Sequence, residues 1–254
     1  MPPAAKYAIQ VSFRGGLSAS IQAVFRAAAA RWERAIAAPL PAVKVGGVVT
    51  TGCLIDAQGI TIDGISGILG MAGPTRLRPA IPKMGKAAYL PCAGAMSFDA
   101  ADLAKMEREG SLLDVITHEM GHVIGIGTIW GRKGVLAGAG SANPTFTGLA
   151  CRHAFRVLGG TSDPVPVENQ GGGGTRDSHW RERYFRNELM TGWVSPAGTK
   201  SPLSALTLGS LEDLGYTVDY SAAEPYSLKP NLLATDEVLV PRRHCAPIIP
   251  FDFA

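Results

Sequence analysis

Long hydrophobic runs are absent from this chain of 254 residues. No apolar stretch approaches the roughly 20 residues that a membrane-spanning helix needs, so we expect no transmembrane segment. The opening residues, Met1–Tyr7, also lack the apolar core of a secretory signal peptide. On this basis the protein is either intracellular or a mature chain whose leader has been removed.

The chain also lacks a large excess of charge of either sign. The 24 Lys and Arg residues nearly balance the 21 Asp and Glu residues, giving a net charge of +3, and the longest basic run is Arg242–Arg243. Such a balance disfavours a nucleic-acid partner. The chain has no internal repeats, and its 46% hydrophobic content is enough for one large domain or for two lobes around a cleft.

Cysteine is sparse and occupies four positions, Cys53, Cys92, Cys151 and Cys245. If these residues are oxidised, three pairings are possible, and joining Cys53 to Cys92 and Cys151 to Cys245 would link the two halves of the chain separately. The low content is equally compatible with reduced thiols. The sequence does not choose among these states.

Two of the five histidines lie four residues apart, in the pentapeptide HEMGH at residues 118–122. On a helix, His118 and His122 project from one face and can reach a single ion. Glu119 lies beside that face, where it can accept a proton from the attacking water. This is the core of a zinc peptidase, because zinc makes a water nucleophilic at neutral pH. The alternative, two surface histidines on an ordinary helix, is disfavoured by the flanking residues.

The flanks predict a helix around this pentapeptide. Ser111 and Asp114 resemble a capping box at its start, and Gly125 can take the positive φ that ends it. The expected buried stripe consists of Leu113, Ile116, Met120 and Val123.

A catalytic zinc site needs a third protein ligand. No Glu occurs between Glu119 and Glu168, which disfavours a glutamate from a helix shortly downstream. Thr128, three residues after Gly125, carries a hydroxyl, which is a poor zinc ligand. The remaining candidates are His153, His179 and His244.

The context of His179 resembles a known family. This histidine ends the Gly-rich segment GGGGTRDSH at 171–179, and Met190 follows in NELMTG at 187–192. Together with HEMGHVIG at 118–125, these residues resemble the leishmanolysin family of metzincin zinc peptidases, over about residues 95–230. That family carries HExxHxxG, a long insertion, a histidine before tryptophan, and a methionine turn in an ELM context.

The resemblance implies an α+β, metzincin-like fold with two lobes around a cleft. Residues 1–130 would form an N-terminal lobe with a twisted mixed sheet, a backing helix and the metal helix. Residues 131–254 would form an irregular C-terminal lobe that supplies the third ligand and the methionine turn. The implied zinc ligands are His118, His122 and His179, with Glu119 as general base, Met190 as an apolar floor beneath the metal, and Gly125 as the turn.

The implied function is a zinc-dependent endopeptidase that acts on polypeptides as a monomer, secreted or at the cell surface. Two other classes stay open, a non-catalytic binding or adhesion module on the same fold and a zinc amidase with a non-protein substrate. In one respect the chain departs from many metzincins. Met190 is followed by Thr191, Gly192 and Trp193, so no tyrosine lies two residues after the methionine.

Other polar candidates have simpler interpretations. The Cys151–His153 pair could bind zinc but is more typical of a structural pair, and His244 is expected at the surface. Asp99 and Asp102 could bind calcium, although helix capping and a solvated helix face are favoured.

Apolar periodicity predicts the remaining elements. Tyr7–Phe13 alternates as a strand with Tyr7, Ile9, Val11 and Phe13 inward, and the next helix carries the stripe Ile21, Val24, Phe25, Ala28, Trp32 and Ile36, with Arg26, Arg31, Glu33 and Arg34 mostly outside. Further expected elements are strands at Val43–Val49 and Ile60–Ile65, helices at Ser97–Glu107, 147–158 and Leu206–Leu214, and loops over 225–254.

Overall fold

The computed structural model describes residues 6–62, 64, 69–161, 163–193, 195–196, 198–228 and 246–247. Its centre is a five-stranded sheet with the order β1-β4-β6-β5-β10. The strands β1, β4 and β6 are mutually parallel, β5 is antiparallel to β6, and β10 is parallel to β5. The sheet is therefore mixed, as expected for an α+β fold. The bounds are β1 Ile9–Phe13, β4 Cys53–Ile60, β5 Gly70–Leu77, β6 Pro91–Asp99 and β10 Ala246–Pro247.

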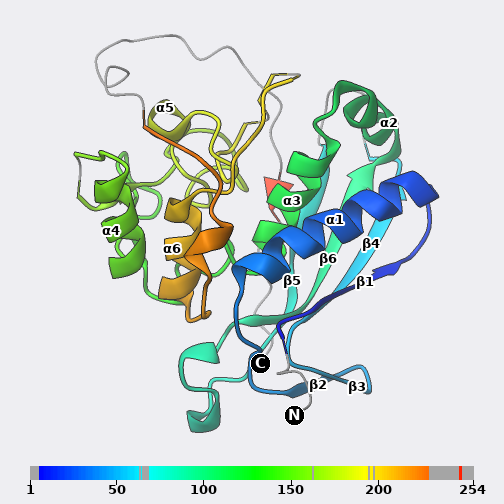
Figure 1. Ribbon diagram of the computed structural model, residues 1–254, viewed down its shortest axis with the longest axis horizontal. Coiled ribbons are helices and arrows are strands. Elements are labelled where there is room, and N and C mark those ends of the chain that lie inside the picture. Colours follow the sequence, from blue (N-terminus) through cyan, green and yellow to red (C-terminus); the bar gives the residue numbers. More distant parts are fainter. Residues whose placement is uncertain are drawn as a thin grey trace.

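Two long helices cover one face of this sheet. Helix α1 (Ala19–Ala35) crosses the sheet, and α3 (Leu112–Val123) lies next to it (Figure 1). The predicted apolar stripe of α1 is buried at Phe25, Ala28 and Trp32, and the Trp32 indole donates to the carbonyl of Thr117 at 3.0 Å. Arg31 was predicted to face outward and is instead buried, at 9% exposure. Its partners, described below, lie in parts of the chain far away in sequence.

The elements of the first half differ in detail from the predictions. The single strand expected at Val43–Val49 is a hairpin of β2 (Val43–Val45) and β3 (Val48–Thr50), because Gly46 and Gly47 take positive φ angles and reverse the chain. The strand predicted at Ile60–Ile65 is wrong where it can be judged. Strand β4 ends at Ile60, the next two residues lie outside any strand, and positions 63 and 65 lie outside the described residues.

Helix α2 (Ala100–Glu109) begins later than the predicted Ser97, because Ser97–Asp99 pair within β6. The carboxylate of Asp99 accepts hydrogen bonds from the backbone N–H groups of Ala101 and Ile62, at 2.8 and 2.7 Å. Asp99 is therefore the N-cap of α2, which confirms the capping interpretation for this residue.

The second half of the chain is built from shorter elements on the other side of α3 (Figure 1). Helices α4 (Leu149–Val157) and α6 (Ala205–Leu214) correspond to the two predicted helices. They pack together, and Asp213 of α6 accepts the N–H groups of Ala150 and Cys151 at the start of α4. The other elements of this half are β7 Leu136–Ala137, β8 Thr145–Phe146, β9 Val165–Pro166, α5 Glu182–Phe185 and the 3-10 helix η2 Tyr220–Ala222. A further 3-10 helix, η1 Pro82–Ala87, lies in the first half.

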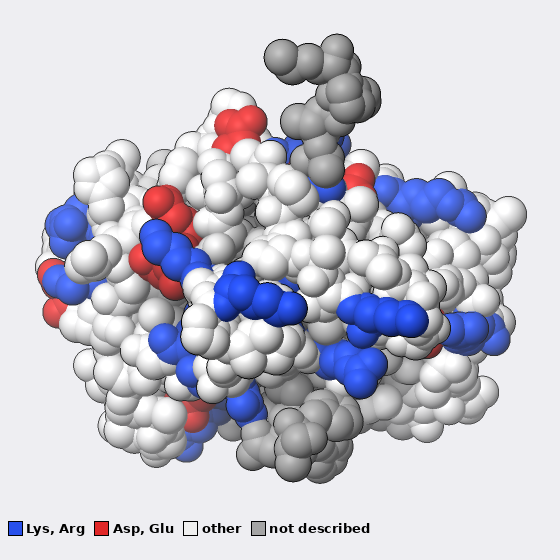
Figure 2. All heavy atoms as spheres, turned by 90° about the horizontal axis from the view of Figure 1, so that it is seen from below, with Lys and Arg blue, Asp and Glu red and all other residues white. Residues whose placement is uncertain are grey.

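Charged side chains are dispersed over the face of the molecule seen in Figure 2, as the near balance of basic and acidic residues suggests. Figure 2 shows Lys and Arg side chains in separate groups among uncharged surface on the face seen from below. None of the helices in the described ranges is long and apolar enough to cross a membrane.

Cys53, Cys92 and Cys151 are buried free thiols, and burial raises the pKa of Cys53 to about 12. Cys245 and His244 lie outside the described residues.

Candidate metal centre

Helix α3 is a core helix and carries the first two histidines. Ten of its twelve residues are buried. The predicted stripe is wrong at Leu113, which is 38% exposed, whereas Leu112 and Val115 are buried. The predicted capping box is also wrong, because the Ser111 side chain makes no capping hydrogen bond. The Asp114 carboxylate binds Arg31 and the backbone N–H of Ser201 instead.

The structure brings His118, His122 and His179 together, although 57 positions separate the last two. Their Nε2 atoms lie 3.0 Å apart for His118 and His122, 3.0 Å for His122 and His179, and 3.1 Å for His118 and His179. All three side chains are buried. Of the two candidates for the third position that lie in the described residues, His153 and His179, it is His179 that reaches the helical pair.

The second nitrogen of each ring fixes its tautomer. The Nδ1 atom of His118 lies 2.7 Å from the carbonyl oxygen of Leu189, that of His122 lies 2.9 Å from Ile126, and that of His179 lies 2.9 Å from Thr175. A carbonyl oxygen can only accept, so each Nδ1 carries the proton and each neutral ring directs an Nε2 lone pair inward.

Three lone pairs that converge in this way repel one another unless a cation lies between them. Zinc–nitrogen bonds of about 2.0–2.1 Å in a tetrahedral arrangement place neighbouring nitrogens about 3.3 Å apart, close to the spacing seen here. Three histidines also leave a fourth position open, as a catalytic zinc site requires. The donor set therefore fits a zinc ion.

Burial keeps His118 and His122 in the form that binds metal. Desolvation lowers the pKa of His118 to about 4 and that of His122 well below its ordinary value. A metal binds the neutral imidazole, so protons compete for these nitrogens only at acidic pH. Glu119 lies between them on the same helix and is fully buried.

The turn after α3 follows the sequence prediction. Gly125 takes a φ of 114°, and its N–H bonds the carbonyl of His122 at 3.1 Å. Thr128, three residues after this glycine, donates its hydroxyl to the same carbonyl at 2.8 Å and is not part of the cluster of three rings.

The segment that carries His179 is held on both sides. The His179 carbonyl accepts the N–H of Glu168 at 2.8 Å, and the next residue, Trp180, donates its backbone N–H to Met190 at 3.0 Å. The Trp180 ring packs against Trp130 with centroids 4.8 Å apart. A side chain at Gly127 would meet the carbonyl oxygen of Ser178 at 2.0 Å, so only glycine allows this approach to α3.

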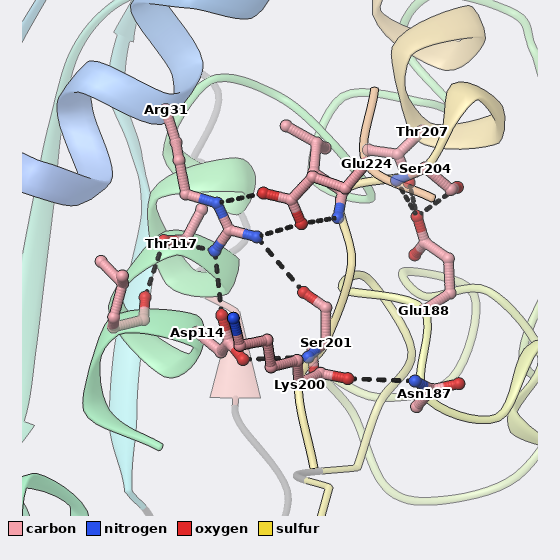
Figure 3. A network of polar contacts seen from close by, with 12 residues as sticks. Arg31, Asp114, Thr117, Asn187, Glu188, Lys200, Ser201, Ser204, Thr207 and Glu224 are labelled. Carbon is pink, nitrogen blue, oxygen red and sulfur yellow. Dashed lines mark hydrogen bonds and ion pairs between the residues drawn. The ribbon is translucent and has the colours of Figure 1, made fainter. Parts of the chain in front are cut away.

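Met190 packs against α3 inside the HEMGH pentapeptide. It is fully buried, and a Cβ atom at Gly121 would lie 2.8 Å from its sulfur. The residue that orients it is Glu188, which our sequence analysis missed. One Glu188 oxygen accepts the Met190 N–H at 2.6 Å, and the other accepts the hydroxyls of Ser204 and Thr207, both at 2.6 Å (Figure 3). Burial raises the pKa of Glu188, while these hydrogen bonds oppose the rise.

We expect Met190→Leu to keep its metal and part of its activity. Leucine has a similar volume, and such exchanges in a core cost less than about 1.5 kcal/mol. Zinc per chain and the melting temperature of the purified variant measure this. Gly121→Ala is the contrasting change, because its added methyl group would press on the same sulfur and should lower the melting temperature more. Loss of zinc in Met190→Leu would mean that the sulfur does more than pack.

A pocket opens directly beside the first histidine, and we call it the His118 pocket. Its walls come from α3, from the segment after Leu189 and from the segment before Pro202. The lining residues are Ser111, Asp114, Val115, His118, Leu189, Thr191, Gly192, Trp193, Ser195, Thr199 and Ser201. The wall of this pocket next to His118 is therefore partly aliphatic and partly formed by hydroxyl groups.

His153, the other ligand candidate in the described part of the chain, does not join this centre. His153 is exposed on α4 and lines a separate cavity between α4 and α6. Within the part of the chain that the structure describes, His118, His122 and His179 form the metal-ligand cluster that is present.

Comparisons with known proteins agree with the motif resemblance. The leishmanolysin family model matches residues 152–231, which include His179 and Met190. Leishmanolysin of Leishmania donovani is 31% identical over 144 residues, which is 53% of this chain and 24% of that protein. A leishmanolysin-like peptidase of Caenorhabditis elegans is 48% identical over 60 residues, and one of Drosophila pseudoobscura pseudoobscura is 46% identical over 63 residues. These two matches cover 23% and 24% of this chain, and 8% and 9% of the relatives. The chain thus spans about a quarter or less of the lengths of these relatives.

Proposed function

Because the leishmanolysin family model matches residues 152–231 and a leishmanolysin is 31% identical over 144 residues, we propose that the chain is a leishmanolysin-like, zinc-dependent endopeptidase. The observation that carries the proposal is the convergence of three buried Nε2 atoms at 3.0–3.1 Å, each on a ring whose Nδ1 is held by a carbonyl. In this proposal His118, His122 and His179 hold one Zn²⁺, and a polypeptide is the substrate.

The residues of the site divide the chemistry among them. When bound, Zn²⁺ supplies Lewis acidity that activates a water and polarises the scissile carbonyl. Glu119 accepts the proton of the attacking water and passes it to the leaving amine. The carbonyls of Leu189, Ile126 and Thr175 keep the three rings oriented and neutral. The His118 pocket receives a substrate side chain next to the scissile bond.

The metzincin-like details belong to the same proposal. Residues 1–130 would be the N-terminal lobe with the mixed sheet and α3, and residues 131–254 would be the C-terminal lobe. Met190 would be the methionine of the turn beneath the metal, a role supported by its packing against Gly121. A monomer at the cell surface or outside the cell stays a prediction from the resemblance.

Metal removal tests the function directly. We expect the purified protein to contain one zinc per chain and to cleave casein, to lose cleavage after treatment with a zinc chelator, and to regain it when zinc is added back. Zinc content and the release of labelled casein fragments measure this.

The other outcomes separate the alternatives. One zinc per chain without casein cleavage would favour a binding module or an amidase with a non-protein substrate. Absence of zinc from the purified protein, with no binding of added zinc, would overturn the metal centre itself.

A further inference from the structure

A polar network is centred on Arg31 (Figure 3), and two of its members, Asp114 and Ser201, line the His118 pocket. The Arg31 side chain extends from α1 and is 10% exposed. Its Nη1 donates to Asp114 at 2.9 Å, while its Nη2 and Nε donate to the two oxygens of Glu224 at 2.7 and 3.1 Å. The guanidinium thus binds one carboxylate from α3 and grips another with both prongs of its fork, an arrangement that lysine cannot reproduce.

The same three residues clamp a short stretch of backbone. The N–H of Ser201 donates to Asp114 at 2.9 Å, and its carbonyl accepts from Arg31 at 3.3 Å. The N–H of Leu203 donates to Glu224 at 3.0 Å. Residues 201–203 are therefore held from both sides by charged groups, and Arg31 joins those groups to one another.

This stretch of backbone leads directly to the metal centre. The carbonyl of Pro202 accepts the N–H of Leu189 at 3.0 Å, and the carbonyl of Leu189 accepts Nδ1 of His118 at 2.7 Å. Asp114 also lies four positions before His118, one turn away on α3. Arg31 is thus connected to His118 through two routes, without touching it.

Asp114 and Ser201 separate two cavities. Both line the His118 pocket, and both also line an outer cavity that is bounded by Arg31, Arg34, Asn187, Lys200 and Glu224. The hydrogen bond from Ser201 to Asp114 is part of the partition between them. The contacts that hold Asp114 and Ser201 in place therefore also set the depth of the His118 pocket.

We propose that Arg31 is a positioning residue that holds this partition closed and so limits the length of the substrate side chain that the His118 pocket accepts. The inference rests on the proposed peptidase function. Without the guanidinium, the carboxylates of Asp114 and Glu224 lose their common partner and turn toward water, because half-buried charges need a counter-charge or hydration. Residues 201–203 then lose their clamp, and the pocket becomes continuous with the outer cavity.

Amide hydrogen exchange on the zinc-loaded full chain tests the clamp without any substrate. We expect Arg31→Met to speed exchange at Ser201 and Leu203 at least 10-fold, because both N–H groups lose an ordered acceptor. Glu224→Gln should speed exchange at Leu203 by a smaller factor. The α4 amides of Ala150 and Cys151, which Asp213 caps, should keep their rates. Unchanged exchange at Ser201 and Leu203 in Arg31→Met would overturn the proposal.

Cleavage selectivity tests the pocket depth. With peptides varied at the positions that flank the scissile bond, we expect Arg31→Met to raise kcat/KM for long side chains relative to alanine at least 10-fold, mostly through KM, with one zinc per chain. Arg26→Met removes the same charge from an exposed position of α1 that lines neither cavity, and it should match the wild type. A lower melting temperature with unchanged selectivity would reduce Arg31 to a structural role and overturn the proposal.

The two proposals fail in different ways. If the wild type cleaves none of these peptides, the peptidase function fails, and the exchange rates still decide whether Arg31 holds the partition. If the wild type cleaves peptides and Arg31→Met shows the wild-type selectivity, only the Arg31 proposal fails.

Discussion

Glu119→Ala is expected to reduce peptide hydrolysis by roughly 100-fold to 10,000-fold, the range in which a general base contributes, and to leave one zinc per chain. The predicted metal ligands are three histidine nitrogens, so removal of the Glu119 carboxylate does not change the ligand set. Zinc content and initial rates on casein and on one short peptide, measured on the same preparation, test both statements.

Glu119→Gln is the control for this change. It keeps the volume of the fully buried side chain and therefore avoids the cavity that alanine leaves. We expect it to be as inactive as Glu119→Ala, because an amide cannot accept the proton of the attacking water. Loss of zinc in Glu119→Gln, or a rate near that of the wild type, would count against Glu119 as the base.

His179→Ala should lower the affinity for zinc by more than roughly 100-fold, which is the upper range for removing only the hydrogen-bond partner of a ligand. The two histidines of α3 would stay in place, because their Nδ1 atoms are bonded to Leu189 and Ile126 and not to the His179 segment. Competition for zinc against a coloured chelator measures the affinity, and circular dichroism shows whether the variant remains folded.

His153→Ala provides the comparison for His179→Ala. It removes an exposed histidine of α4 that is not part of the cluster of three rings, and the variant should bind zinc as tightly as the wild type. An unchanged zinc affinity in His179→Ala, with normal circular dichroism, would move the third ligand to another residue. Weaker binding in both variants would indicate a general loss of folding.

Most of the candidate centre was predictable because it depends on local spacing. The spacing of four positions from His118 to His122 places both rings on one helical face wherever that helix packs. A positive φ at Gly125 likewise follows from the need to end the helix. The choice of His179 depended on its motif context, since no local rule relates it to a pair 57 positions away.

The strands of the sheet were predictable only in part. Strand β1 alternates and was found, whereas β5 contains Gly70, Gly73 and Pro74, and β6 is rich in small residues. Such segments have low intrinsic strand propensity, and their pairing with neighbours decides their conformation. The start of α2 was misplaced for the same reason, because Ser97–Asp99 pair with β4 and β5.

Buried charges were the largest source of error. Arg31 and Glu188 were missed because sequence rules place charged residues at the surface, where they occur most often. Arg31 is buried because Asp114 and Glu224 meet it there, and Glu188 because Ser204 and Thr207 do. All of these partners lie at least 16 positions from the residue they bind.

The sequence by itself determined the helical pair of histidines, the glutamate between them and the family to which their context points. These features follow from the period of a helix and from residue types whose chemistry is specific. The tertiary structure alone decided that His179 closes the triad, that Asp114 binds Arg31 instead of capping α3, and that Ser201 forms part of a partition. Each of these results depends on which distant segments compete for the same hydrogen bonds, and that competition is settled only when the chain is packed.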